Sequence, residues 1–287
     1  MKFEEKKCKS VLSKSGIYDV DYSINPYIGC EHGCKYCYAT FMKKFTKHHE
    51  KWGEFVDIKT NSLKILENDL MKNKKGLILL SSVTDPYQPI EKKYGLTRNI
   101  LKRLAHSKFS VNILTKSDLI VRDLDILKKF NSGKISIGFT INFLNENDRK
   151  IWEPNAPRIS DRLKALKTIS ERGIDCYVHV GPYMEGITNL EKILDKIEQY
   201  TKEMQIESIN LKNNEKKITN TIKKHYTSLE GRYKKILEDK TNYLRNMKEK
   251  TENLKNKSEV PIKIFLNQSN WPNKKSSSGK QTSLMRT

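Results

Sequence analysis

The chain has no apolar run of membrane-spanning length and few cysteines, and both shortages limit the class of protein. No hydrophobic stretch approaches the roughly 18 residues of a transmembrane helix. The first sixteen residues, MKFEEKKCKSVLSKSG, have no apolar core of the length that a signal peptide requires. We therefore expect a cytoplasmic protein without a membrane partner. Its five cysteines are an odd number, which argues against a disulfide framework.

Acidic residues are scarce relative to basic ones. The chain has 34 Asp and Glu against 55 Lys and Arg, a formal net charge of +21 at pH 7. This excess favours an anionic partner such as DNA or RNA. The alternative is a lysine-rich genome that inflates lysine everywhere, in which case the charge does not report on the substrate.

The first two thirds of the chain alternate short β-rich runs with amphipathic helical stretches, which is typical of βα units around a parallel sheet. About six repeats predict an α/β fold, a partial or full βα barrel, with its chemistry on loops at the carboxyl ends of the strands. We assign residues 1–20 to an N-terminal extension and 21–213 to the barrel. The predicted strands are Tyr22–Ile28, Phe55–Ile58, Leu77–Ser81, Val111–Thr115, Ile135–Ile141, Cys176–Val180 and Ile206–Leu211.

The sequence changes character after residue 213. Residues 214–266 are predicted to form a basic helical extension, and the polar tail 267–287 is predicted to be disordered. Four lysines of the extension lie seven residues apart in pairs, so they are expected to form one continuous basic face. They are Lys216, Lys217, Lys223 and Lys224.

The strongest motif is the run of three cysteines at Cys30, Cys34 and Cys37, with spacing C-x3-C-x2-C, between a predicted strand and a helix. Thiolates are soft ligands suited to an iron–sulfur cluster. Three ligands would leave one iron open to a substrate or cofactor, as in catalytic metal sites. The alternative is a structural zinc site with His32 or Cys176 as the fourth ligand.

With aromatic Tyr36 before the third cysteine, this motif resembles the radical S-adenosylmethionine (SAM) superfamily. The strings NPYIGCEHGCKYCYAT, SSVTDPYQPIEKKYGLTR and WEPNAPRISDRLKAL resemble its spore photoproduct lyase-like family. The resemblance implies a partial (β/α)6 barrel, a [4Fe–4S] cluster on the three cysteines, and SAM on the unique iron. It also implies reductive SAM cleavage to a 5′-deoxyadenosyl radical that abstracts hydrogen, with an electron donor such as flavodoxin or ferredoxin as a partner.

The resemblance also implies roles for residues near strand ends. Tyr36 would lie near the adenine, and Tyr38 would be catalytic, in radical transfer. Asp85, with its neighbours Ser82 and Thr84, would lie against the methionine amino group of SAM. The further positions are Lys116 on SAM, Thr140 and Asn142 near the ribose hydroxyls, and Glu153 and Arg162 as an ion pair or SAM contact, with a structural role favoured for Arg162.

One departure from the lyase pattern matters. The family position of the lyase's hydrogen-donating cysteine is Val83 here, so that donor cannot be carried over. Three hypotheses follow: a radical SAM enzyme that repairs or modifies nucleic acid, a radical SAM enzyme acting on a peptide, protein or small molecule, and a zinc-stabilised nucleic-acid-binding protein without catalysis.

Overall fold

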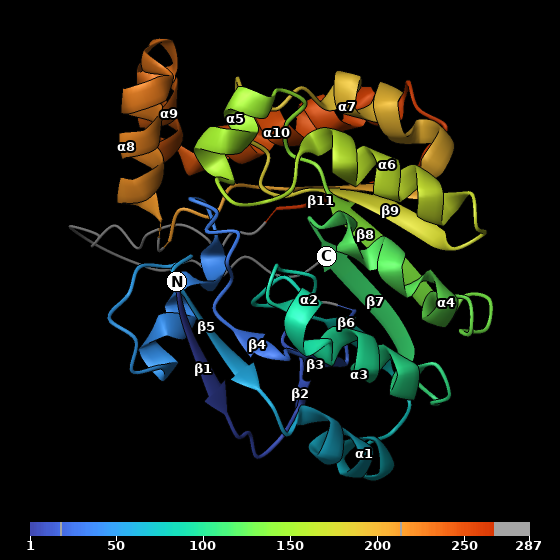
Figure 1. Cartoon of the computed structure of the whole chain (residues 1–287). Helices are drawn as coiled ribbons and strands as arrows, with labels where there is room; N and C mark the ends of the chain where they lie inside the picture. Colours follow the sequence, from blue (N-terminus) through green and yellow to red (C-terminus); the bar gives the residue numbers. More distant parts are fainter. Residues whose placement is uncertain (18, 213, 267–287) are drawn as a thin grey trace, which may run out of the picture.

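The computed structural model describes residues 1–17, 19–212 and 214–266, and its centre is an eight-stranded sheet (Figure 1). The strand order is β11-β10-β9-β8-β7-β6-β3-β2, in which β2 is antiparallel to β3 and all other neighbours pair in parallel. The strands are β2 (Leu12–Lys14), β3 (Tyr22–Ile24), β6 (Leu77–Leu80), β7 (Ser110–Thr115), β8 (Ile135–Thr140), β9 (Asp175–Val180), β10 (Glu203–Glu207) and β11 (Ile262–Phe265).

Helices between consecutive parallel strands cover one face of this sheet (Figure 1), and the central strands β8 and β9 are buried at nearly every position. On β7, buried residues alternate with partly exposed ones, because successive side chains of a strand point to opposite faces. Six parallel strands, β3 and β6 to β10, with their helices form the expected partial (β/α)6 barrel. The helices are α1 (Ser62–Lys72), α2 (Glu91–Tyr94), α3 (Leu96–Leu104), α4 (Leu124–Leu127), α5 (Glu146–Trp152), α6 (Ile159–Ser170) and α7 (Leu190–Ile197), with 3-10 turns η1 (Tyr38–Phe45), η2 (Asp118–Asp123) and η3 (Glu198–Tyr200).

A second, three-stranded sheet lies beside the barrel, and it contains one predicted strand and part of another. Its order is β1 (Lys2–Lys6), β5 (Phe55–Lys59), β4 (Tyr27–Ile28). The predicted strand Phe55–Ile58 therefore belongs to this sheet and not to the barrel. The predicted strand Tyr22–Ile28 is divided between the two sheets at Pro26, because proline has no backbone N–H to donate to a neighbouring strand.

Three helices follow the barrel: α8 (Glu215–His225), α9 (Glu230–Glu238) and α10 (Lys240–Lys255), with the 3-10 turn η4 (Thr227–Leu229). In Figure 1, α8 and α9 lie at the upper left, far from α1 at the bottom. The chain then returns to the barrel as β11, which pairs in parallel with β10 and was not expected from the sequence. The predicted strand Ile206–Leu211 begins earlier, at Glu203, and ends at Glu207. The predicted disordered tail lies outside the described residues.

Across the described parts of the chain, no helix combines the length and the apolar character that crossing a membrane would require.

Candidate active site at the cysteine loop

Cys30, Cys34 and Cys37 lie on one irregular segment, residues 29–37, which we call the cysteine loop. Cys30 and Cys34 are buried and Cys37 is partly buried. The loop follows β4 and turns through Gly29, whose φ is +88°. A Cβ at Gly29 would lie 2.3 Å from the carbonyl oxygen of Phe55. The loop can therefore take this path only with glycine at that position.

The segment after β6 holds the first half of the cysteine loop. The Gln88 side chain accepts the N–H of Glu31 at 2.9 Å and donates to the Gly29 carbonyl at 3.3 Å. The Thr84 hydroxyl donates to the same carbonyl at 2.6 Å. Thr84, predicted to lie beside SAM, thus contacts the backbone of the cysteine loop.

Two asparagines from distant segments hold the remainder of the loop. The Asn155 side chain donates to the Glu31 carbonyl at 2.9 Å. The Asn214 side chain, just before α8, donates to the Cys37 carbonyl at 2.9 Å. Sequence reasoning found neither residue, because a single asparagine in a loop carries no signal of a partner more than a hundred residues away.

The chemistry of the donor set fits a metal cluster. Burial raises the pKa of each thiol above its ordinary value, to about 12 for Cys34, where Lys116 partly opposes the rise. A metal supplies the positive charge that thiolates need in such surroundings. In tetrahedral zinc sites with Zn–S bonds of about 2.3 Å, ligand sulfurs lie roughly 3.8 Å apart.

The described residues do not form the alternative zinc site. Among them, the group of three or more His, Cys, Asp or Glu ligand atoms within 4.8 Å of one another is Glu4, His48 and Asp57, which includes no cysteine. Cys176 lies in the hydrophobic core, and His32 Nδ1 is 3.4 Å from the carboxylate of Asp85. The sulfurs of Cys30, Cys34 and Cys37 therefore do not all lie within 4.8 Å of one another.

Tyr38 and Ser82 meet at the edge of the loop. The Tyr38 hydroxyl donates to the Ser82 carbonyl, and the Ser82 hydroxyl accepts from the Asn25 side chain at 3.1 Å. The Tyr38 side chain is 41% exposed, and burial raises the pKa of its hydroxyl. Ser81, which precedes Ser82, has a φ of +69°. This is a strained conformation of the kind that clusters at functional sites.

Asp85 joins the ends of β6 and β7. One carboxylate oxygen accepts from the Tyr87 N–H at 2.9 Å and the Thr115 hydroxyl at 2.7 Å. The other accepts the Lys116 N–H at 2.8 Å. Both predicted SAM contacts, Asp85 and Lys116, are therefore brought together, and Asp85 already fixes the backbone from which the Lys116 side chain extends.

A buried network connects Tyr36 to the barrel. Its hydroxyl donates to the carboxylate of Glu153, which forms an ion pair with Arg162, and both charged side chains are fully buried. Burial alone would raise the pKa of Glu153, but Arg162 and then Lys116 lower it overall. The Lys116 ammonium lies 5.8 Å from the centre of the Tyr36 ring. Arg162 thus has the structural ion pair favoured from the sequence.

Thr140 is the last residue of β8, and Asn142 lies two residues beyond it. The Thr140 carbonyl accepts from Arg162 at 3.1 Å. Asn142 is fully buried and donates to the Tyr36 hydroxyl at 2.8 Å, and its side-chain oxygen accepts the Gly181 N–H at 2.8 Å. Asn142 therefore links three segments of the site.

Strands β9 and β10 carry polar side chains that sequence reasoning missed. The Tyr177 ring lies over Gly138, where a Cβ would come within 2.2 Å of it, and its hydroxyl donates to Asn112 at 2.7 Å. At the carboxyl ends of β9 and β10, His179 Nε2 lies 3.3 Å from the Glu207 carboxylate. These residues alternate with buried apolar ones, which was the available signal.

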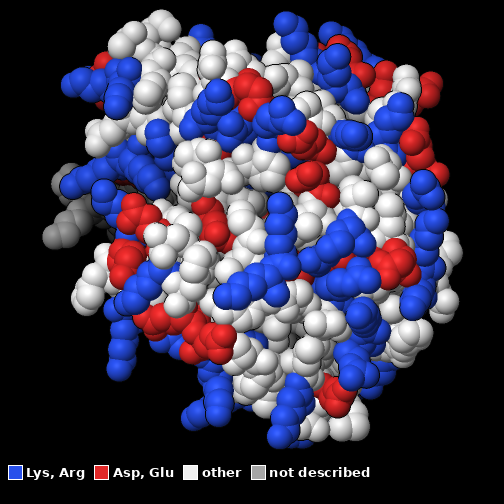
Figure 2. All heavy atoms as spheres, in the orientation of Figure 1, with Lys and Arg blue, Asp and Glu red and all other residues white. Residues whose placement is uncertain are grey.

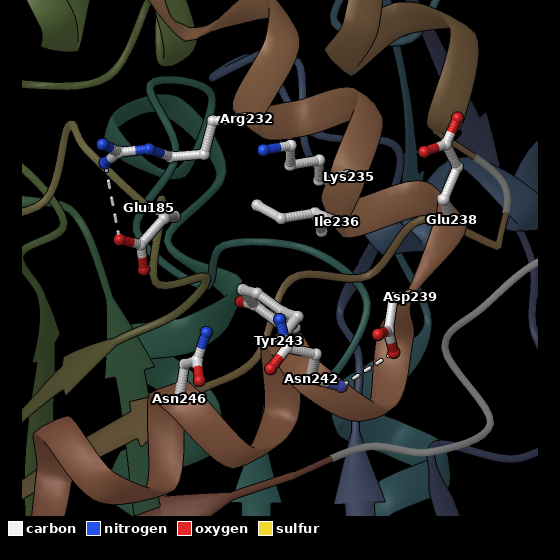
Figure 3. A pocket seen from close by; sticks show the side chains of 9 residues that line it. All are labelled: Glu185, Arg232, Lys235, Ile236, Glu238, Asp239, Asn242, Tyr243 and Asn246. Atoms are coloured by element: carbon white, nitrogen blue, oxygen red, sulfur yellow. Dashed lines mark hydrogen bonds and ion pairs between the residues drawn. The ribbon is translucent and has the colours of Figure 1, made fainter.

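A separate pocket of about 330 Å³ lies between α9, α10 and the segment after β9 (Figure 3). Arg232 reaches toward Glu185 across it, at 3.6 Å, and the Asp239 side chain accepts the Asn242 N–H at 2.9 Å. Its lining includes no residue of the cysteine loop. The pocket is thus distinct from the candidate active site.

Two curated relatives share much of the chain. An uncharacterized protein of Methanocaldococcus jannaschii is 40% identical over 262 residues, which cover 90% of this chain and 94% of the relative. An uncharacterized protein of Mycobacterium bovis is 29% identical over 203 residues, which cover 68% of this chain and 60% of the relative.

Solved structures share the fold at low identity. Spore photoproduct lyase complexed with dinucleoside spore photoproduct has a TM-score of 0.59 at 14% identity, and the match covers 78% of this chain and 66% of the lyase. SuiB of Streptococcus suis bound to S-adenosylmethionine has a TM-score of 0.54 at 14% identity, over 85% of this chain and 49% of SuiB.

The family model described as the Radical SAM superfamily matches residues 24–197, from β3 through α7. That range includes the cysteine loop and the ends of β6, β7 and β8, where the candidate site residues lie. Members of this family are enzymes that use a [4Fe–4S] cluster and SAM. The chain therefore belongs to the Radical SAM superfamily.

Proposed function

We propose that this enzyme holds its cluster through Cys30, Cys34 and Cys37 and acts on a nucleic-acid substrate, in repair or modification. The cluster with SAM supplies a carbon radical able to abstract hydrogen. The chain contributes the surroundings: Lys116 would offer a positive charge to the SAM carboxylate, and the exposed Tyr38, whose hydroxyl donates to the Ser82 carbonyl, lies just after the third cysteine. The hard chemistry belongs to the cofactor, while the protein orients it and excludes water.

The observation that carries the nucleic-acid proposal is a lysine cluster beside the cysteine loop. Lys35 lies in the loop, and Asn214, just before α8, donates to the Cys37 carbonyl at 2.9 Å, which places α8 and its lysines beside the loop. Burial lowers the pKa of Lys35, and the charges of Lys217 and Lys224 lower it further. Phosphate groups would relieve this repulsion and release counterions on binding. The cluster therefore fits a polyanion whose bases reach the barrel mouth.

The expected single face of four lysines is divided in the structure. Lys216, Lys223 and Lys224 are exposed on α8, whereas Lys217 is half-buried. Burial lowers the pKa of Lys217, and the charges of Cys37 and Cys34 partly oppose this. Basic side chains are scattered over the face in Figure 2, with acidic ones among them and uncharged surface between. Position beside the cysteine loop, and not charge alone, distinguishes the α8 lysines.

A peptide substrate is the second candidate, favoured by polar side chains at the carboxyl ends of β9 and β10. There His179 lies next to the partly exposed Glu207, whose carboxylate can accept hydrogen bonds. Acceptors of this kind suit N–H groups of a peptide as well as those of a base. SuiB bound to its precursor peptide shares the fold, with a TM-score of 0.54.

The deciding experiment measures binding to DNA and RNA oligonucleotides as a function of salt. Reversing Lys216, Lys223 and Lys224 to Glu should weaken binding at least tenfold at about 50 mM salt and flatten the salt dependence. Lys217 is left intact because it lies beside the cysteines. The matched control reverses three exposed lysines at the end of α1 and just beyond it: Lys72, Lys74 and Lys75.

Equal losses in the two variants would mean that net charge alone attracts nucleic acid. No binding by the wild type at low salt would move the proposal to a peptide substrate. Formation of 5′-deoxyadenosine without substrate should be unchanged in both variants, because the exposed lysines do not contact the proposed SAM residues.

A further inference from the structure

The 3-10 turn η1, which begins directly after the third cysteine, carries an exposed aromatic pair. Phe45 is 73% exposed, the largest exposed fraction of any aromatic residue in the described part of the chain. The partly exposed Phe41 meets it edge-on, with ring centroids 6.5 Å apart and the ring planes at 89°. Phe41 thus supports the Phe45 ring at one side, while most of that ring remains open to solvent.

The aromatic pair lies in a segment whose charges are all positive. Residues 32–49 hold no Asp or Glu and four lysines, which are Lys35, Lys43, Lys44 and Lys47. Lys44 and Lys47, on either side of Phe45 in the sequence, are exposed, whereas the Lys43 ammonium donates to the His49 carbonyl at 2.9 Å. An exposed ring between cations is complementary to a ligand in which flat apolar groups alternate with anions. An unpaired nucleic-acid strand is such a ligand, because its bases are flat and its phosphates are negative.

The aromatic pair lies near the candidate active site. Asn214, just before α8, donates to the carbonyl of Cys37, the residue that precedes η1. The beginnings of η1 and α8 are therefore side by side. Because a 3-10 helix rises about 2 Å per residue, Phe45 lies at most about 14 Å from Tyr38 along η1. One strand is thus able to contact the α8 lysines and Phe45 together.

We propose that Phe45 stacks on an unpaired base of a single-stranded nucleic acid, a base that flanks the one entering the barrel, and that Lys44 and Lys47 contact the adjoining phosphates. The inference rests on the proposed function and narrows its substrate to an unpaired strand or a locally opened duplex. Stacking on an aromatic ring tolerates any base, because every base has a π-face. Bases inside a regular duplex are stacked on their neighbours, so a duplex offers only phosphates here. Phe45 is therefore a specificity-determining residue and does not take part in the chemistry.

The test compares a labelled single-stranded oligonucleotide with the duplex of the same sequence, by fluorescence anisotropy at about 50 mM salt. Phe45→Ala should weaken single-strand binding about tenfold, because it removes the stacking surface, and should leave duplex binding unchanged. Phe45→Trp should retain single-strand binding. Met71→Ala is the matched control, because Met71 on α1 is 74% exposed, and its affinities should equal those of the wild type. The double variant Lys44→Ala/Lys47→Ala should weaken both complexes and flatten their salt dependence.

A second measurement varies the ligand. Single abasic positions are moved along the unpaired strand, and the position that meets Phe45 should cost the wild type about tenfold in affinity. The same abasic position should cost Phe45→Ala nothing, because the ring that held the base is gone. Formation of 5′-deoxyadenosine without substrate should be equal in Phe45→Ala and the wild type, because Phe45 lies outside the cysteine loop.

The possible failures are distinguishable. Wild-type affinity of Phe45→Ala for the single strand, or an equal loss for single strand and duplex, overturns the inference and leaves the proposed function standing. Binding of neither oligonucleotide by the wild type at low salt overturns both. A wild-type dimer that Phe45→Ala converts to a monomer in size-exclusion chromatography means that a second copy covers the aromatic pair, and the inference is then wrong.

Discussion

Removing the carboxylate of Glu153 should destabilise the protein more than removing any surface acid. Glu153 and Arg162 form an ion pair in which both side chains are 0% exposed. In Glu153→Ala, Arg162 keeps its hydrogen bonds to the carbonyls of Pro157 and Thr140, but its charge stays buried without a counterion. Breaking a buried pair in this way costs about 3 to 5 kcal/mol.

The expected size can be measured as unfolding free energy in denaturant, followed by circular dichroism. Each kcal/mol corresponds to about 2 to 4 °C in Tm for a large domain, so the loss is roughly 6 to 20 °C. The double variant Glu153→Ala/Arg162→Met should recover part of it, because no buried charge is left without a partner. Asp161→Ala, whose partner Arg158 is 70% exposed, should cost less than about 1 kcal/mol.

The same pair predicts a direction for pH dependence. The pKa of Glu153 is lower in the folded protein than the ordinary value of 4.5, so its contribution to stability is present above that ordinary value and is lost as the pH falls through the lowered pKa. As the pH is lowered from 5, the unfolding free energy of the double variant should therefore fall less than that of the wild type. If Glu153→Ala costs no more than Asp161→Ala, the buried charge is compensated in a way that the network around Tyr36 does not explain.

Two further predictions concern the cofactors. Replacing any one of the three cysteines of the cysteine loop with Ala should abolish the cluster absorption and SAM cleavage, whereas Cys8→Ala and Cys176→Ala should retain both, as absorbance and product analysis will show. Asp85→Ala and Lys116→Ala should keep the cluster but weaken SAM binding about ten- to a hundredfold, since each removes a charge-assisted contact of about 1.5 to 3 kcal/mol. Asp85→Ala also removes the acceptor that fixes the Lys116 backbone. Wild-type SAM affinity in both variants by equilibrium dialysis would contradict these roles.

The barrel was predictable because its strands are short apolar runs between amphipathic helices, as at β7 and β8. Three strands were missed for a physical reason. Strand β1, KFEEK, is largely exposed and charged, β2 has only three residues, and β11 is a four-residue strand that follows three helices and pairs with β10. Such short or polar strands form because a partner strand is available elsewhere in the chain, and local sequence propensity does not report that partner.

The candidate site was predictable where functional residues follow a recognisable spacing in the sequence. The cysteine spacing identified the loop, and the resemblance gave the strand-end positions that the structure brings together, such as Asp85 and Lys116. The residues that hold the loop, Gln88 and Asn214, could not be found. A polar side chain that supports a loop through a long-range hydrogen bond looks, in one sequence, like any other surface residue.

The most direct test of the central claim is anaerobic reconstitution followed by incubation with SAM and dithionite. The account predicts a brown protein with about four irons and four sulfides per chain, which forms 5′-deoxyadenosine and methionine, while the variant lacking all three cysteines of the cysteine loop forms neither. Bound zinc without iron, or an intact cluster that leaves SAM uncleaved, would contradict it.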